Sequence, residues 1–187
     1  MMPLISNWRN TPPCQASIAQ RYWLKRSGAL TSGLKKLGHV QITVLNESCT
    51  SLKEEDSIAI QIPVHTPIWV REIMMSIDNT PCIWARSITP LSAAQSVWKG
   101  IRQLQTRPLA DMLYHDPSIT RSMFECINIK QSTVLRHTHQ RYFNTPLPTD
   151  YYARRSVFQR AKQPLMVTEC FLPAFWLLLN KQINYRF

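Results

Sequence analysis

Two charged side chains stand in otherwise apolar stretches of this 187-residue sequence, Glu169 within QPLMVTECFLP and Arg71 within IWVREIMM. The prolines that flank the first stretch are typical of strand boundaries, because proline cannot donate a hydrogen bond to a sheet. Side chains alternate along a strand, so Glu169 shares its face with Leu165, Val167 and Phe171. A buried carboxylate needs either a proton or a positive partner. Glu169 is therefore the structural partner of a buried arginine or a proton donor with a raised pKa.

The stretch IWVREIMM is largely apolar on both faces, which indicates a central strand, and each face carries one charge, Arg71 or Glu72. A guanidinium is always ionised and stays in a core only beside an anion, preferably in a bidentate geometry. That anion is either structural, such as Glu169, or the carboxylate of a bound ligand. A buried arginine and a buried carboxylate on separate strands suit a small anionic ligand handled without metal or cofactor.

Other candidate residues give weaker signals. Arg154 and Arg155 are neighbours in a predicted strand, so they point to opposite faces and at most one enters a site. His137 and His139 have a spacing that could chelate a metal on a strand. No carboxylate or thiol stands near them in the sequence, so we expect exposed histidines and no metal site.

Several classes of protein are excluded by missing motifs. With only four glycines, the sequence has neither a GxGxxG nor a P-loop pattern, and it has no nucleophile elbow and no HExxH. Its five cysteines are odd in number and form no CxxC, which predicts free thiols, mostly in the core. The length suits one domain over residues 1–187, with a real hydrophobic core.

The formal net charge is +11, from 22 basic and 11 acidic residues. Such a surplus suits nucleic acid, an anionic membrane or a small polyanion. The basic residues are scattered, however, so we expect a solvated basic surface and no nucleic-acid partner. The apolar tract from Cys170 to Leu179 is interrupted by Pro173 and is too short to span a bilayer. Because the N-terminus also lacks the apolar core of a signal peptide, we expect a soluble, cytoplasmic protein. We also expect it to be a monomer.

The elements that hold these residues are read from periodicity and turn residues, with Trp8 as an anchor of an irregular N-terminal arm. The segments 47–56 and 130–150 are predicted as loops. The class is α+β, with roughly six mostly antiparallel strands and two helical pairs. Helices are expected over 13–25, 30–37, 92–104 and 108–114, and strands over 39–46, 58–62, 68–75, 82–88, 123–129, 151–159 and the Glu169 stretch.

Taken in order, the segments IWVREIMM, ARSITP, RPLADMLY, ITRSMFE and ARRSVFQRAKQPLMVTECFLP resemble the bacterial chorismate pyruvate-lyase family. Near the N-terminus, WLKRSGALTSGL resembles the WL and GSLT segment of that family. Each motif is short, but the ordered succession runs from about Trp8 to Pro173 and covers most of the chain. The chain departs from the commoner pattern of the family in four places. Ala110 stands where many members have glycine, and Leu30 stands where some members have methionine. GALT replaces GSLT, and segment 130–150 also differs in sequence.

The resemblance implies an enzyme that cleaves chorismate to 4-hydroxybenzoate and pyruvate, the committed step feeding ubiquinone synthesis, with no metal or cofactor. It implies a single antiparallel sheet of about six strands with helical flaps over an internal ligand site. In that site Arg71 and the Leu109 N–H would hold the ring carboxylate, Glu169 would face the product hydroxyl, and the flap residue Leu30 would cover the ring. Arg155 is our candidate for the carboxylate of the enolpyruvyl side chain.

Two questions stay open at the level of sequence. Glu169 either protonates the leaving side chain or only orients the substrate for a concerted pericyclic reaction that needs no acid. The alternative function is a non-catalytic ligand-sensing domain, because effector domains of some bacterial repressors share the implied fold. Such repressors carry a helix-turn-helix domain ahead of it, which we do not expect in the short stretch before the first matching segment.

Overall fold

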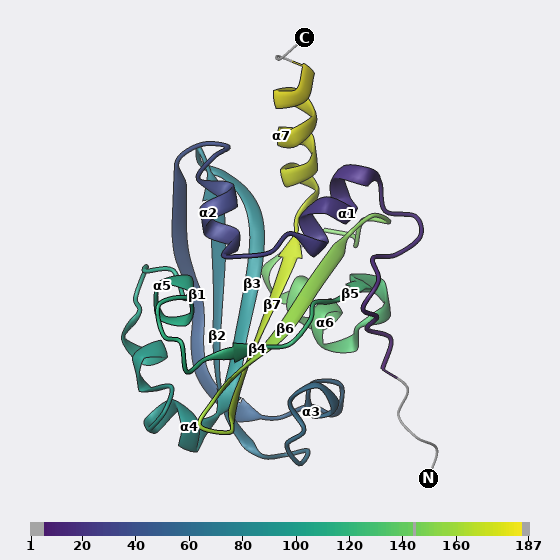
Figure 1. Cartoon of the computed structure of the whole chain (residues 1–187). Helices are drawn as coiled ribbons and strands as arrows, with labels where there is room; N and C mark the ends of the chain where they lie inside the picture. The colour runs from purple at the N-terminus through teal and green to yellow at the C-terminus, as the bar shows by residue number, and fades with distance from the viewer. Residues whose placement is uncertain (1–5, 144, 185–187) are drawn as a thin grey trace.

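One seven-stranded antiparallel sheet is the frame of the protein in the computed structural model, which describes residues 6–143 and 145–184 (Figure 1). The strands lie in the order β1-β2-β3-β7-β6-β4, and β5 pairs with a further part of β6. The strands are β1 (Val40–Ser51), β2 (Pro67–Ile77), β3 (Thr80–Pro90), β4 (Thr120–Arg121), β5 (Glu125–Asn128), β6 (Tyr152–Arg160) and β7 (Gln163–Phe171). The predicted class is confirmed, and the short β4 is the strand that the sequence reading missed.

Helices cover both faces of this sheet and are mostly short. Most of them connect consecutive strands, whereas α7 follows the last strand and leads away from the sheet (Figure 1). The helices are α1 (Ile18–Lys25), α2 (Leu30–Leu34), α3 (Glu54–Ile60), α4 (Leu91–Gln95), η1 (Lys99–Gln103), α5 (Ala110–Leu113), η2 (Ile129–Gln131), α6 (Thr133–Tyr142) and α7 (Pro173–Asn184). None of the helices in the described part of the chain is long and apolar enough to cross a membrane.

The hairpin of β2 and β3 forms the centre of the sheet, as the sequence predicts. Its turn residues Asp78 and Asn79 have φ angles of 46° and 65°, a left-handed conformation that these two residue types tolerate well. The register pairs Arg71 with Ser87 and Ile73 with Ala85. The hairpin therefore places the face of Arg71 next to a row of small side chains on β3.

Strand β7 inserts between β3 and β6, so the Glu169 stretch is a central strand. Glu169 lies opposite Ala85 on one side and opposite Arg154 on the other. Leu165 and Phe171 are buried on the same face, which confirms the predicted alternation. One cross-sheet row therefore joins Ile73, Ala85, Glu169 and Arg154.

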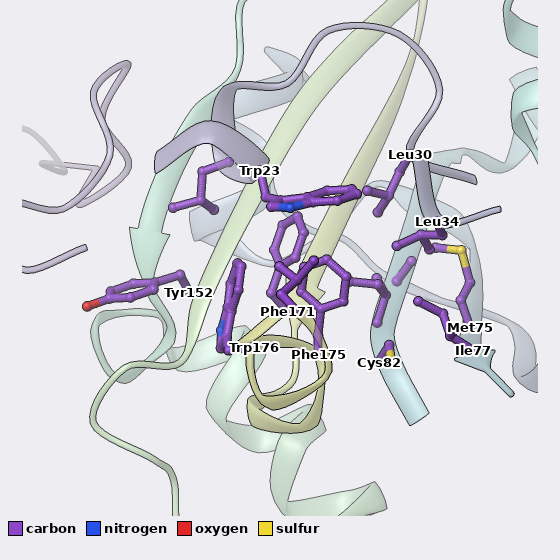
Figure 2. Close-up of a cluster of buried hydrophobic side chains, with 14 of the residues drawn as sticks. Trp23, Leu30, Leu34, Met75, Ile77, Cys82, Tyr152, Phe171, Phe175 and Trp176 are labelled. Carbon is purple, nitrogen blue, oxygen red and sulfur yellow. The ribbon is translucent and has the colours of Figure 1, made fainter. Parts of the chain in front are cut away.

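The face that carries Arg71 and Glu169 is covered at its two ends by two apolar clusters. At one end α1, α2 and α7 pack on the sheet, with the Trp23 ring lying over Phe171 and Phe175 (Figure 2). At the other end α4, η1 and α5 pack Trp98, Leu109 and neighbouring apolar residues on the sheet. The site predicted from the sequence lies between these two covers.

The opposite face of the sheet is covered by α3, α6 and the N-terminal arm, where Trp8 is buried as predicted. Both helices correct the sequence reading, which placed α6 in a loop and α3 across a loop and a short strand. Helix α6 begins at an N-cap, because the Ser132 hydroxyl accepts a hydrogen bond from the Leu135 N–H. His139 lies inside this helix and is buried, so the expectation of an exposed histidine was wrong for it.

The predicted helix over residues 92–104 is interrupted. Helix α4 ends at Gln95, and the chain resumes as the 3-10 helix η1 at Lys99. The break turns Trp98 fully into the core, where its indole N–H donates to the Gln163 carbonyl at 3.0 Å. Burial of this large ring outweighs the continuity of the helix.

Candidate active site

A small internal cavity of about 50 Å³ lies between the two covers, on the sheet face of Arg71 and Glu169. Its floor comes from β2, β3, β6 and β7, and its roof from α2, the segment before α5 and β4. The lining residues are Ala29, Leu30, Thr31, Ile42, Arg71, Ile73, Met75, Ala85, Ser87, Pro108, Leu109, Ala110, Leu113, Tyr114, Arg121, Ser156, Phe158, Val167 and Glu169. Most of these side chains are apolar, so the few charged groups define its chemistry.

Arg71 forms one pole of the cavity and is almost fully buried. Its Nε donates to the Glu47 carboxylate at 3.0 Å, and its Nη2 donates to the Gln105 carbonyl at 2.6 Å. Burial lowers the pKa of the guanidinium, and the charge of Glu47 opposes that shift. Among the described residues no hydrogen bond uses Nη1, so one donor of this fixed guanidinium remains for a ligand.

Glu169 forms a second pole, and its partner is Arg154 rather than Arg71. The Arg154 Nε donates to the Glu169 carboxylate, while its Nη1 donates to the carbonyls of Trp23 and Arg26 at the end of α1. Glu169 therefore is the partner of a buried arginine, one of the two alternatives raised for it, and it also lines the cavity. In this pair the Glu169 carboxylate is the hydrogen-bond acceptor.

The two poles are separated by β3 and belong to adjacent rows of the sheet. Two strand spacings and a shift of two residues place the Arg71 and Glu169 Cα atoms about 12 Å apart. Their side chains point to the same side, with the small residues Ala85 and Ser87 between them.

Leu30, predicted to cover the ring, and Leu109, predicted to offer its backbone N–H, both line the cavity and are almost fully buried. Leu30 also belongs to the apolar cluster of α1, α2 and α7, so it joins the cavity roof to that core (Figure 2). Leu109 is the residue just before α5. Its backbone N–H makes no hydrogen bond to the described residues and so remains free for a ligand carboxylate.

Arg155, by contrast, does not reach the cavity. It follows Arg154 on β6 and points to the opposite face, where its Nε donates to Glu125 at 2.8 Å and its guanidinium lies over the Trp8 ring. The strand alternation allowed only one of the two arginines on the site face, and the pairing with Glu169 selects Arg154. The choice of Arg155 as a substrate ligand is therefore not supported by its position.

Arg121 and Tyr114 are charged or polar lining residues that the sequence reading did not assign. The Arg121 Nε donates to the Ser156 hydroxyl at 2.9 Å, and its Nη1 donates to the Tyr114 hydroxyl at 2.8 Å. Burial raises the pKa of Tyr114, and the charge of Arg121 opposes the shift. Arg121 stands in the quoted segment ITRSMFE, so an arginine next to a strand was visible, but nothing in its spacing pointed to the site.

A larger cavity of about 730 Å³ lies on the opposite face of the sheet, between α3 and α6. Two buried charged residues, Arg86 and Glu72, line it and are already paired: Arg86 with Asp56 at 2.8 Å, and Glu72 with the Tyr142 hydroxyl, from which it accepts a hydrogen bond. No residue of the predicted site lines this cavity. Four of the predicted site residues, Arg71, Glu169, Leu30 and Leu109, line the smaller cavity instead.

An internal, mainly apolar cavity with charged residues at its poles, built on one antiparallel sheet, is typical of a small-molecule site in an α+β protein. The chain belongs to the chorismate lyase family, whose sequence pattern matches residues 2–181. The probable chorismate pyruvate-lyase of Bordetella pertussis is 47% identical over 187 residues, which are 99% of this chain and 98% of that protein. Probable chorismate pyruvate-lyase 1 of Burkholderia pseudomallei is 36% identical over 171 residues, covering 91% and 92% of the two chains.

Solved structures of similar shape include effector domains of transcriptional regulators. The effector domain of PhnF from Mycobacterium smegmatis has a TM-score of 0.52 at 12% identity, covering 78% of this chain and 89% of that one. A GntR-family regulator from Bacillus cereus has a TM-score of 0.51 at 10% identity, covering 72% and 92%. At such low identity the likeness concerns the fold alone.

Proposed function

We propose that this protein cleaves chorismate to 4-hydroxybenzoate and pyruvate, the first committed step of ubiquinone biosynthesis. The observation that carries the proposal is the cavity with Arg71 at one pole and Glu169 at the other, in a chain of the chorismate lyase family. Relatives named probable chorismate pyruvate-lyase over nearly the full chain add support. The proposal places catalysis in the orientation of the substrate by side chains of this chain.

The ring carboxylate would bind at the Arg71 pole. The free Nη1 of Arg71 and the free Leu109 N–H are the donors available there, and charge-assisted hydrogen bonds of this kind are short and strong. Glu47 and Gln105 hold the guanidinium in place, so little ordering is needed when the substrate binds. Leu30 would close over the ring from the roof.

Glu169 would accept a hydrogen bond from the ring hydroxyl, at the end of the ring opposite the carboxylate. Its ion pair with Arg154 favours the role of acceptor over that of proton donor. Of the two mechanisms left open by the sequence, we therefore propose the concerted one. Glu169 positions the ring in it and does not supply a proton.

In that reaction the ether bond between the ring carbon and the side-chain oxygen breaks. The hydrogen of the adjacent, hydroxyl-bearing ring carbon passes to the terminal methylene of the side chain, which leaves as pyruvate. The electron pair of that C–H bond completes the aromatic ring, so atoms and electrons balance without an external reactant. Aromatisation supplies the driving force, and the cavity has to hold the ring and the side chain in the reactive geometry.

The alternative function is ligand sensing without catalysis, favoured only by the shape shared with effector domains of regulators. Incubating the purified protein with chorismate and following the absorbance of 4-hydroxybenzoate distinguishes the two. The proposal expects product to accumulate in proportion to protein concentration. Binding of chorismate without product above the uncatalysed rate would instead identify a sensing domain.

A further inference from the structure

Arg121 differs from the other interior arginines because it has no carboxylate beside it. Each of the fully buried arginines forms an ion pair: Arg71 with Glu47, Arg86 with Asp56, Arg154 with Glu169 and Arg155 with Glu125. Arg121 is half-buried and has no ion-pair partner among the described residues. The charge of Glu169 acts on Arg121, but the Glu169 carboxylate is paired directly with Arg154, so the Arg121 guanidinium can still accept an anion from outside the chain.

The Arg121 guanidinium is held rigidly. Besides the hydrogen bonds to Ser156 and Tyr114, its Cζ lies 3.8 Å from the centroid of the Phe124 ring and 5.1 Å from that of Phe158. These rings fix its plane and contribute cation–π attraction. Its Nη2 makes no hydrogen bond to the described residues, so a donor is left for a ligand.

Arg121 and Tyr114 also stand between two cavities. Outside the inner cavity lies an outer pocket of about 400 Å³, lined by Leu113, Tyr114, His115, Asp116, Pro117, Ile119, Arg121 and Phe158. Leu113, Tyr114, Arg121 and Phe158 line both spaces. The acid of the outer pocket, Asp116, is occupied by Arg160 at 3.1 Å and by the N–H and hydroxyl of Ser118.

The inner cavity alone is too small for the whole substrate. Its volume of about 50 Å³ is room for about four water-sized positions, whereas the substrate carries a ring and a three-carbon acid side chain. Ser156, which accepts a hydrogen bond from Arg121, lies in the same cross-sheet row as Arg71. Three strand spacings separate the Cα atoms of Arg71 and Ser156 by about 14 Å. Two guanidinium groups therefore face the cavity from different sides, which suits a ligand with two carboxylates.

We propose that Arg121 binds the carboxylate of the enolpyruvyl side chain, and that the outer pocket receives this side chain and then the departing 2-oxo acid. This inference rests on the proposed function. Arg121 takes the role of binding the enolpyruvyl carboxylate, which Arg155 cannot fill because it points to the other face of the sheet. In the reaction the ether oxygen becomes the keto oxygen of pyruvate and the methylene carbon gains the ring hydrogen. The carboxylate bound by Arg121 is unchanged, so the same contact holds the side chain before and after cleavage.

Arg121→Met tests the assignment, because methionine keeps the apolar stem and removes the charge. We expect the KM for chorismate to rise about tenfold to a hundredfold, the loss typical of a charge-assisted hydrogen bond. The Kd of 4-hydroxybenzoate, which lacks the second carboxylate, should change less than about threefold. Inhibition by millimolar pyruvate should weaken in the variant. Arg121→Lys keeps the charge and should restore part of the affinity, and it replaces Arg121→Met if that variant does not fold.

Arg136→Met is the matched control, since Arg136 is exposed on α6 on the other side of the sheet. If the wild type is active and Arg121→Met has the same KM for chorismate as Arg136→Met, the assignment of Arg121 is overturned and the proposed function stays intact. An equal loss of affinity for 4-hydroxybenzoate and chorismate in Arg121→Met would also overturn it. A wild type that neither converts chorismate nor binds 4-hydroxybenzoate would instead reject the proposed function itself.

Discussion

At the scale of single residues, Glu169 has two tasks that are separable by mutation. It neutralises the buried Arg154, and it lines the cavity. Amide replacement keeps a hydrogen-bond acceptor of the same shape but removes the charge and the acidic proton. Stability and turnover should therefore respond differently to that change.

For Glu169→Gln we expect the free energy of unfolding to fall by about 2–4 kcal/mol, because Arg154 is left buried without a carboxylate. Turnover by the folded variant should fall less than about tenfold, whereas a general acid would account for about a hundredfold or more. Urea unfolding and kcat measured on the same preparation check both values. Glu54→Gln, at an exposed site on α3, is the control. A loss of kcat above a hundredfold would instead support the hypothesis that Glu169 donates a proton.

The buried Cys126 predicts a loss of stability at alkaline pH. Burial raises its pKa from 9.0 to about 11, so the folded protein keeps the thiol protonated where the unfolded chain releases the proton. The protonated Cys126 thiol therefore contributes about 2–3 kcal/mol to the free energy of unfolding. This contribution is fully present below pH 9 and is lost as the pH rises from 9 through about 11.

Burial also raises the pKa of Cys82 and Cys170, so urea unfolding at pH 8 and pH 10.5 is compared between wild type and Cys126→Ala. An equal loss of free energy of unfolding in the two proteins would contradict the assignment to Cys126. Iodoacetamide at pH 8.5 should label the exposed Cys14 and Cys49 and leave Cys126 unmodified until the chain unfolds. That labelling pattern reports the same protected thiol by an independent route.

At the scale of elements, strands were predicted better than helices, for physical reasons. In β2 and β7 the nearly continuous apolar runs follow from a sheet covered on both faces. The segment of α6 has few apolar residues among histidines and arginines, and its burial is set by Leu135 and His139 packing on a sheet that is distant in sequence. For α3 the acidic first turn was a usable helix signal, but the isoleucines at 58, 60 and 62 imitate a strand.

Helix α3 is attached to the sheet by the buried pair of Asp56 and Arg86. Asp56→Ala should lower the free energy of unfolding by about 3–5 kcal/mol, because Arg86 loses its closest carboxylate. The double variant Asp56→Ala with Arg86→Met should lose less stability than the sum of the two single variants, since the pair can be broken only once, while Glu72 keeps its hydrogen bond from the Tyr142 hydroxyl. Because the pair lies on the face away from the cavity, the KM for chorismate should stay within about twofold of wild type in folded protein. A double variant as unstable as the sum of the singles would contradict the pairing.

At the scale of the whole molecule, the positions of Arg71, Glu169, Leu30 and Leu109 were predictable because the ordered motifs span the chain, and all four line one cavity. The partner of each charge was not predictable, since it depends on register. The row that sets Arg154 against Glu169 also turns Arg155 to the other face. Arg121 was missed for a similar reason, because its place in the site depends on a two-residue strand at the edge of the sheet.

The net charge of +11 should assist capture of a dianionic substrate by the whole molecule. Raising the ionic strength from about 10 mM to about 200 mM shortens the Debye length from about 30 Å to below 10 Å. The KM for chorismate should then rise several-fold while kcat stays nearly constant. Initial rates at constant pH measure this effect, and a KM independent of salt would argue against long-range attraction.

The central claim is that chorismate is bound and cleaved in the cavity between Arg71 and Glu169. Arg71→Met tests it most directly, with turnover of chorismate and binding of 4-hydroxybenzoate measured on one sample and Arg136→Met as the control. Loss of the guanidinium should lower kcat/KM by at least about a hundredfold and weaken binding of 4-hydroxybenzoate by a similar factor, because both ligands carry the ring carboxylate. A folded Arg71→Met variant with wild-type kcat/KM and wild-type product affinity would contradict the account.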